Sequence, residues 1–146
     1  MIETREQWLL GGIAALRLIF RDAGHAIPLN VRVTCGWPSK SALARKKQRI
    51  GECWADTMSE DKHFEIFVSP SLSEPLRVLD TLAHELVHAS VGLAAKHGKL
   101  FKQCAVSIGL EGKMTSTLPG PIMRVFISQF EKENGPYPAG AMLRSM

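Results

Sequence analysis

The sequence predicts an α+β fold in which helices surround a small three-stranded antiparallel sheet. Apolar residues recur at helical spacing in four stretches, and three short strand-like stretches lie together between the first and second of them. The length of 146 residues suits one domain, and the apolar fraction of 45% and charged fraction of 22% are ordinary for a globular protein. We therefore expect a single domain over residues 1–146, with a turn-rich tail at 135–146.

The first helix is expected to begin after Thr4. Thr4 and Gln7 have the spacing of a capping box, and one face then carries apolar residues up to Gly24, a natural stop. The apolar stretch 8–20 is interrupted by Arg17 and is too short to span a bilayer. Three widely spaced cysteines without a C-x-x-C pair suit a reducing compartment. We expect a cytoplasmic protein without a membrane partner.

Three strands are expected at 29–34, 50–56 and 63–69, because their residues alternate or are mainly apolar. The polar stretch 58–62 suits a hairpin turn between the second and third strands. We expect the three strands to form a small antiparallel sheet. One edge of such a sheet could accept an extended peptide as an added strand.

Residues 39–49 carry several cations and no acid. Such a run is typical of a solvated loop or short helix, and it also fits a phosphate-facing patch that contacts DNA. The net charge of +4 permits contact with nucleic acid without requiring it. The candidate nucleic-acid contacts are Lys40, Arg45, Lys46, Lys47 and Arg49.

The central helix carries the motif H-E-x-x-H. Ser73 is a natural N-cap for this helix, and Pro75 suits its first turn. His84 and His88 project from one face about 5–6 Å apart at Cβ, so both imidazoles can reach one ion at about 2.0–2.1 Å. Glu85 can then address a water on that ion. The alternative is two partly exposed histidines beside a solvated glutamate.

A catalytic zinc needs a third protein ligand, with the fourth position left for water. Gly92 lets the chain leave the helix and turn back, which makes His97 the preferred candidate. Glu111 is the rival and would give a site of two histidines and one glutamate.

For two other side chains that are candidates for the expected site, the sequence allows two roles each. Asp80 lies one turn before His84 and either orients its imidazole or is exposed. Tyr137, the only tyrosine, could donate to an oxyanion, but a packing or surface role is favoured. Further helices are expected at 99–108 and from Pro121, with Gly135 as the end of the last.

With these residues, the chain resembles the SprT-like family of zinc metallopeptidases, which includes the Spartan proteases. The resemblance rests on H-E-x-x-H at 84–88 followed by H-G-x-x-F at 97–101. It is supported by G-E-C-W at 51–54 and I-F-V-S-P at 66–70. A weaker match, G-P-Y-P at 135–138, is similar to a stretch in phage-type members.

The resemblance implies His84, His88 and His97 as ligands of one zinc ion and Glu85 as general base. It also implies a zincin-like helical fold with a small sheet. The best-known family members cleave proteins attached to DNA, which would give the basic run a purpose. Many members continue into a Cys-rich zinc ribbon, which this sequence lacks, so DNA recognition stays open.

The sequence thus supports a hypothesis of a zinc-dependent endopeptidase that acts on proteins or peptides, with DNA-associated proteins among its candidate substrates. An alternative is a DNA- or protein-binding module with a structural zinc site. A third is another zinc hydrolase, such as an amidase.

Overall fold

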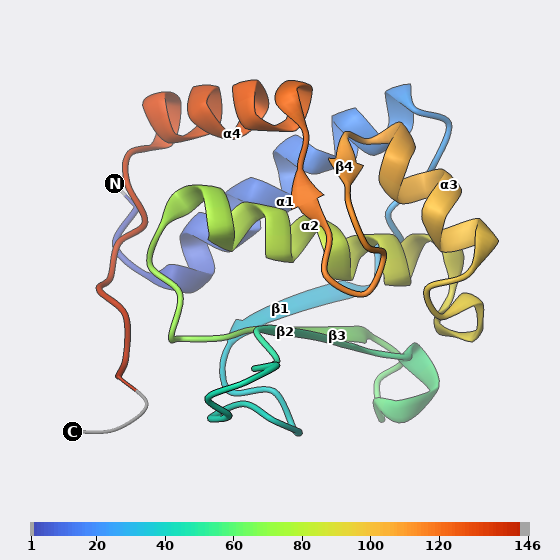
Figure 1. The fold of residues 1–146 in the computed structure, drawn as a ribbon, viewed down its shortest axis with the longest axis horizontal. Helices are drawn as coiled ribbons and strands as arrows, with labels where there is room; N and C mark the ends of the chain where they lie inside the picture. The colour runs from blue at the N-terminus through green and yellow to red at the C-terminus, as the bar shows by residue number, and fades with distance from the viewer. Residues whose placement is uncertain (1, 144–146) are drawn as a thin grey trace.

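The computed structural model describes residues 2–143, and within them helices and small sheets combine as the sequence predicts. Four α-helices, a three-stranded sheet and a two-stranded sheet make up this part of the chain (Figure 1). In chain order the elements are α1 (Arg5–Asp22), β1 (Val31–Cys35), β2 (Gly51–Trp54), the 3₁₀ turn η1 (Asp56–Met58), β3 (Phe64–Val68), α2 (Pro75–Val91), the 3₁₀ turn η2 (Leu93–Ala95), α3 (Lys99–Ser107), β4 (Leu110–Glu111), β5 (Leu118–Pro119) and α4 (Pro121–Asn134).

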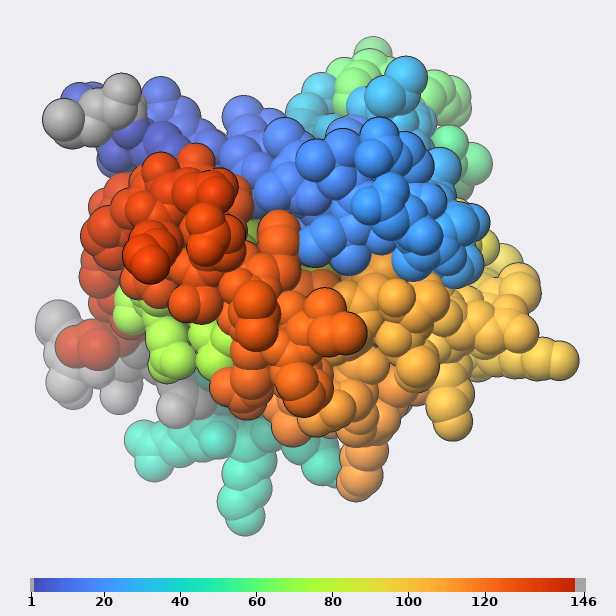
Figure 2. All heavy atoms as spheres, turned by 90° about the horizontal axis from the view of Figure 1, so that it is seen from above, coloured from blue at the N-terminus to red at the C-terminus, as the bar shows by residue number. Residues whose placement is uncertain are grey.

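Helix α2 is the centre of the fold. It runs between the three-stranded sheet on one side and the other helices on the opposite side (Figure 1). Leu79, Leu82 and Leu86 on α2 are fully buried. Helices α1, α3 and α4 form one continuous face of the molecule (Figure 2). Because most of α2 is covered in this way, side chains on its remaining open flank are held on a rigid support.

Helix α1 begins as predicted and packs unusually close to α2. The side chain of Thr4 accepts from the Gln7 N–H at 3.1 Å, and the Gln7 side chain accepts from the Thr4 N–H at 3.0 Å, which completes the capping box. A Cβ atom at Gly12 would lie 2.7 Å from Leu79 Cδ2, so the absence of a side chain there allows the close approach.

No helix within residues 2–143 is long and apolar enough to cross a membrane.

The three-stranded sheet is mixed, so the prediction of an antiparallel sheet is wrong. Its strand order is β1-β3-β2, with β2 antiparallel and β1 parallel to β3. The predicted hairpin of β2 and β3 is present. Residues 36–50 reverse the chain through a long irregular loop rather than a tight turn. This loop sets β2 apart from β1, and β3 lies in the space between them.

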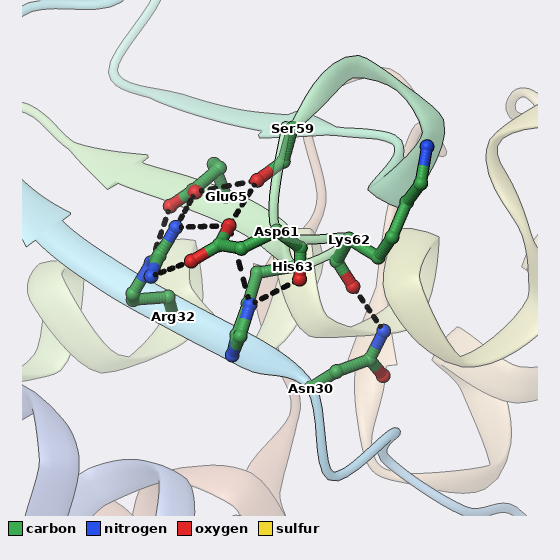
Figure 3. A network of polar contacts seen from close by, with 7 residues as sticks. All are labelled: Asn30, Arg32, Ser59, Asp61, Lys62, His63 and Glu65. Carbon is green, nitrogen blue, oxygen red and sulfur yellow. Dashed lines mark hydrogen bonds and ion pairs between the residues drawn. The ribbon is translucent and has the colours of Figure 1, made fainter.

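A polar network joins β1 to β3 and to the turn before β3 (Figure 3). Arg32 on β1 donates to both carboxylate oxygens of Asp61, at 2.8 and 2.9 Å, and also binds Glu65, its register partner on β3. Ser59 donates to Asp61 at 2.7 Å. The Arg32 guanidinium holds the pKa of the Asp61 carboxyl well below its usual range. These contacts favour the parallel register, although their exposure keeps the contribution of each ion pair small.

The end of the described chain has no regular secondary structure, as predicted, but it packs on the body of the protein. Tyr137 is 6% exposed and meets Trp8 edge to face, with ring centroids 5.1 Å apart. Trp8 Nε1 donates to the carbonyl of Gly135 at 3.0 Å. The last part of the expected tail, residues 144–146, lies outside the described residues.

Candidate metal centre

Three histidines from two segments meet on the open flank of α2. His84 and His88 lie one turn apart on the helix, with ring centroids 5.3 Å apart. Gly92 has a φ of 93° and ends α2, and η2 then turns the chain back. His97 thereby reaches the pair, at centroid distances of 5.4 Å from His84 and 4.8 Å from His88. One ligand nitrogen from each ring lies within 4.8 Å of the others, so the cluster could hold a metal ion.

The nitrogen spacing and the protonation of the rings both fit a metal. His88 Nε2 and His97 Nε2 are 3.2 Å apart. Two nitrogens at about 2.0–2.1 Å from a tetrahedral zinc would be about 3.3 Å apart.

Burial, followed by the charges of the neighbouring histidines, lowers the pKa of His84 to about 3. Burial and the charge of His97 likewise lower the pKa of His88 to about 4. Both rings are therefore neutral at pH 7, the form that binds metals.

Phe101 on α3 forms the apolar support of the cluster. It is fully buried, and its ring centroid lies 5.0 Å from that of His84, 4.6 Å from that of His88 and 4.9 Å from that of His97. This single aromatic ring contacts all three imidazoles. It excludes water from their inner side and limits how the rings can turn.

Thr117, just before β5, positions His84. Its hydroxyl lies 2.7 Å from His84 Nδ1, and Thr117 as a residue is only 5% exposed. With Nδ1 engaged, Nε2 is the nitrogen of His84 that remains for an ion. His88 Nδ1, in contrast, is buried and has no hydrogen-bond partner among residues 2–143. Thr117 could not be identified from the sequence, because no local spacing relates it to His84.

Glu85 is buried beside the histidines. Its side chain packs against Gly51 at the start of β2, where a Cβ atom would lie 2.7 Å from Glu85 Oε2. Burial raises the pKa of Glu85 to about 8, against a lowering by Arg49. The glycine therefore has a steric role at the site. In the sequence, only the G-E-C-W stretch of the family resemblance points to this glycine.

Asp80 takes neither of the two roles considered from the sequence. It is 2% exposed, and its carboxylate accepts from Arg77 at 3.1 Å and from the Thr81 hydroxyl at 3.3 Å. Burial raises its pKa to about 6. Thr117 rather than Asp80 contacts Nδ1 of His84.

A cavity of about 790 Å³ opens over the three histidines and Glu85. Its floor is the open flank of α2. One wall is formed by residues 47–51, which lead into β2, and the opposite wall by Lys113 and residues 115–117 between β4 and β5. In Figure 1, the ribbon between β4 and β5 passes in front of α2, and β2 lies on the sheet side of that helix. The candidate metal centre is thus reached through a cleft between two loops.

The remaining candidates from the sequence lie in different places. Of the basic run, Lys47 and Arg49 line the cavity, and the other three cations do not. Glu111 lies on β4 near Gly120 and is not part of the histidine cluster. Tyr137 is in the core beside Trp8 and does not line the cavity. The three cations outside the cavity are Lys40, Arg45 and Lys46.

Comparisons with known proteins add no relative. No family model, no curated protein and no solved structure matches the chain.

Proposed function

We propose that the protein is a zinc-dependent endopeptidase of the kind found in the SprT-like family. The observation that carries the proposal is the meeting of three imidazoles and a buried carboxyl group at the floor of one cleft. This set of groups is the one that metal-assisted hydrolysis requires.

His84, His88 and His97 would hold the ion, with Thr117 keeping His84 in the required orientation. Zinc at three such ligands supplies a Lewis acid that lowers the pKa of water toward about 7. The number of ligands favours a catalytic site, because structural zinc sites have four protein ligands and no open position. This argues against the alternative of a binding module with a structural zinc.

Glu85 would act as general base and then as general acid. Its carboxylate accepts a proton from the attacking water and afterwards donates that proton to the leaving amine. A general base is most effective when its pKa lies near the working pH. Burial gives Glu85 a pKa of about 8, which is close to that condition.

The edge of the sheet offers a place for an extended substrate. The strand order leaves β2 at an edge, and Gly51 at its start packs against Glu85. A peptide that paired with this edge would run along the cleft that contains the candidate metal centre, because Gly51 lines that cleft. This placement favours a peptide bond over the small amide of an amidase substrate. Whether the substrate is bound to DNA stays a prediction from the family resemblance.

The test is to compare zinc content and proteolysis in matched variants. Glu85→Gln should keep one zinc per chain and lose cleavage of unfolded proteins by at least about 10²-fold, the lower range for a general base. His97→Ala should lose zinc, whereas Glu111→Ala, a control that lies outside the histidine cluster, should keep it. Zinc is measured by elemental analysis and cleavage by gel and mass spectrometry. Proteolysis that persists at full rate in Glu85→Gln would refute the mechanism.

A further inference from the structure

The cleft beside the candidate metal centre is lined by four cationic side chains, of which Arg49 is paired with Glu52 at 3.8 Å and Arg77 with Asp80. Its cations come from both walls and from the floor, so they surround the space that a substrate would occupy. Two of them, Lys47 and Lys113, stand on opposite walls, and both are exposed. The cations that line the cleft are Lys47, Arg49, Arg77 and Lys113.

The acids in the cleft do not balance this charge. Asp80 is buried and forms an ion pair with Arg77 at 3.1 Å. Glu85 is buried against Gly51. Neither carboxylate is placed to neutralise the exposed cations of the walls, so Lys47 and Lys113 present free positive charge to a ligand.

We propose that this cleft selects peptide segments that carry aspartate or glutamate beside the bond to be cleaved. The inference rests on the proposed peptidase function and assigns its substrate class. Lysine ammonium and arginine guanidinium groups form charge-assisted hydrogen bonds with carboxylates. With cations on both walls, an acidic side chain on either side of an extended peptide meets a positive partner.

The shape of the site favours a peptide over nucleic acid. A cavity of about 790 Å³ is of the size that holds a small ligand or a short peptide segment. Duplex DNA instead needs cations spread along a backbone that carries one charge per about 1.7 Å of helix axis. The basic run does not line the cleft as a unit, because only Lys47 and Arg49 of its five cations are among the lining residues.

Binding can be measured without catalysis in the zinc-loaded Glu85→Gln variant. The probes are three fluorescein-labelled peptides of about ten residues, identical except for glutamate, glutamine or lysine at the central positions. Fluorescence anisotropy should give an affinity for the glutamate peptide about tenfold higher than for the glutamine peptide. The lysine peptide should bind more weakly than both.

Charge-reversal substitutions in the same Glu85→Gln variant then test which lysines cause the preference for the glutamate peptide. Lys47→Glu and Lys113→Glu should each weaken binding of the glutamate peptide by about fivefold, the upper range for one partly exposed charge pair. Lys46→Glu is the matched control for the first, because it is the adjacent residue, is exposed and lies outside the cleft. Lys102→Glu on α3 is the control for the second. Each control should change the affinity by less than about twofold.

Several outcomes would overturn the inference. Equal affinity for the glutamate and glutamine peptides would do so. Equal losses of affinity for the glutamate peptide in the cleft variants and in their controls would also do so, because they would indicate only a general attraction to a basic protein. A DNA duplex that displaces the glutamate peptide and loses affinity in the cleft variants alone would assign the cleft to nucleic acid.

Cleavage by the unmutated protein separates this inference from the proposed function. Cleavage of all three peptides at the same rate would leave a peptidase and refute the acidic preference. Selective binding of the glutamate peptide without cleavage of any peptide would support the acidic site and refute the peptidase.

Discussion

At the scale of single residues, the orientation of the His84 imidazole in the candidate metal centre depends on a hydroxyl from a distant part of the chain. Thr117 contacts Nδ1 of His84 at 2.7 Å from a loop 33 positions further along the sequence. His84 is thereby fixed by a neighbour that local pattern cannot identify, whereas the H-E-x-x-H spacing alone places His84 and His88 on one helix face.

Replacing Thr117 with valine should therefore weaken zinc binding. The variant keeps the volume of the side chain but removes the partner of His84 Nδ1, and loss of such a partner lowers metal affinity by about 10–100-fold. Competition with a fluorescent chelator measures the affinity. Thr115→Val is the control, because Thr115 is exposed in the same loop. Equal affinities in the two variants would contradict a positioning role for Thr117.

Asp80 should make the stability of the fold depend on pH. Burial raises its pKa from 3.8 to about 6, so the folded state binds a proton more tightly than the unfolded state. Its contribution to stability is therefore full below about pH 4 and is lost as the pH rises through about 6. The unfolding free energy of the wild type should fall relative to that of Asp80→Asn across this interval.

Urea titrations between pH 4 and pH 7.5 measure this difference. Glu60→Gln is the control, because Glu60 is exposed; its unfolding free energy should follow that of the wild type. A difference between the wild type and Asp80→Asn that is constant across the interval would show that the Asp80 proton affinity is unchanged by folding.

At the scale of elements, helices were predictable and the sheet topology was not. The ends of α1 and α4 follow from a capping box and from Pro121 and Gly135, which act within a few residues. Strand order depends on contacts across the fold, such as that of Arg32 with Asp61 and Glu65. The sequence shows each of these residues but not that β3 separates β1 from β2.

The two adjacent glycines of α1 should respond to alanine in opposite ways. At Gly12 a Cβ atom would lie 2.7 Å from a methyl group of Leu79, which is fully buried. At Gly11 the nearest atom, on Phe130, is 3.6 Å away. Gly11→Ala should gain up to about 1 kcal/mol from helix propensity. In Gly12→Ala, overpacking of about 1–3 kcal/mol should offset or exceed that gain.

Thermal and urea unfolding of the two variants measure the effect. Because both variants gain the same helix propensity, the unfolding free energy of Gly12→Ala should be about 1–3 kcal/mol below that of Gly11→Ala. Equal stabilities would mean that α1 and α2 can separate without loss, and that their close approach is not required.

At the scale of the whole molecule, the two ends of the described chain are packed together. Tyr137 lies against Trp8 of α1 and donates to Cys35 Sγ of β1 at 3.8 Å. The turn-forming residues around Tyr137 indicate irregular structure correctly, but they carry no information on what such a segment packs against. Tyr137 lies in an irregular segment and is yet part of the core.

Tyr137→Ala should consequently destabilise the whole fold. Removal of a buried aromatic side chain costs about 3–5 kcal/mol, whereas Tyr137→Phe keeps the ring and removes only the hydroxyl. Urea unfolding monitored by Trp fluorescence measures both variants. A tail that contributes nothing to the core would leave Tyr137→Ala as stable as Tyr137→Phe.

The loop between β4 and β5 is held by close backbone contacts at its base, whereas its tip is exposed to solvent. At the base, the Gly120 N–H donates to the Gly109 carbonyl at 2.7 Å, and a Cβ atom at Gly120 would lie 2.9 Å from that same oxygen. At the tip, Lys113, Thr115 and Ser116 are exposed. Substitutions at the tip can therefore accumulate during evolution without disturbing the core or Thr117. The residues of one wall of the cleft can therefore vary while His84, His88 and His97 keep their arrangement.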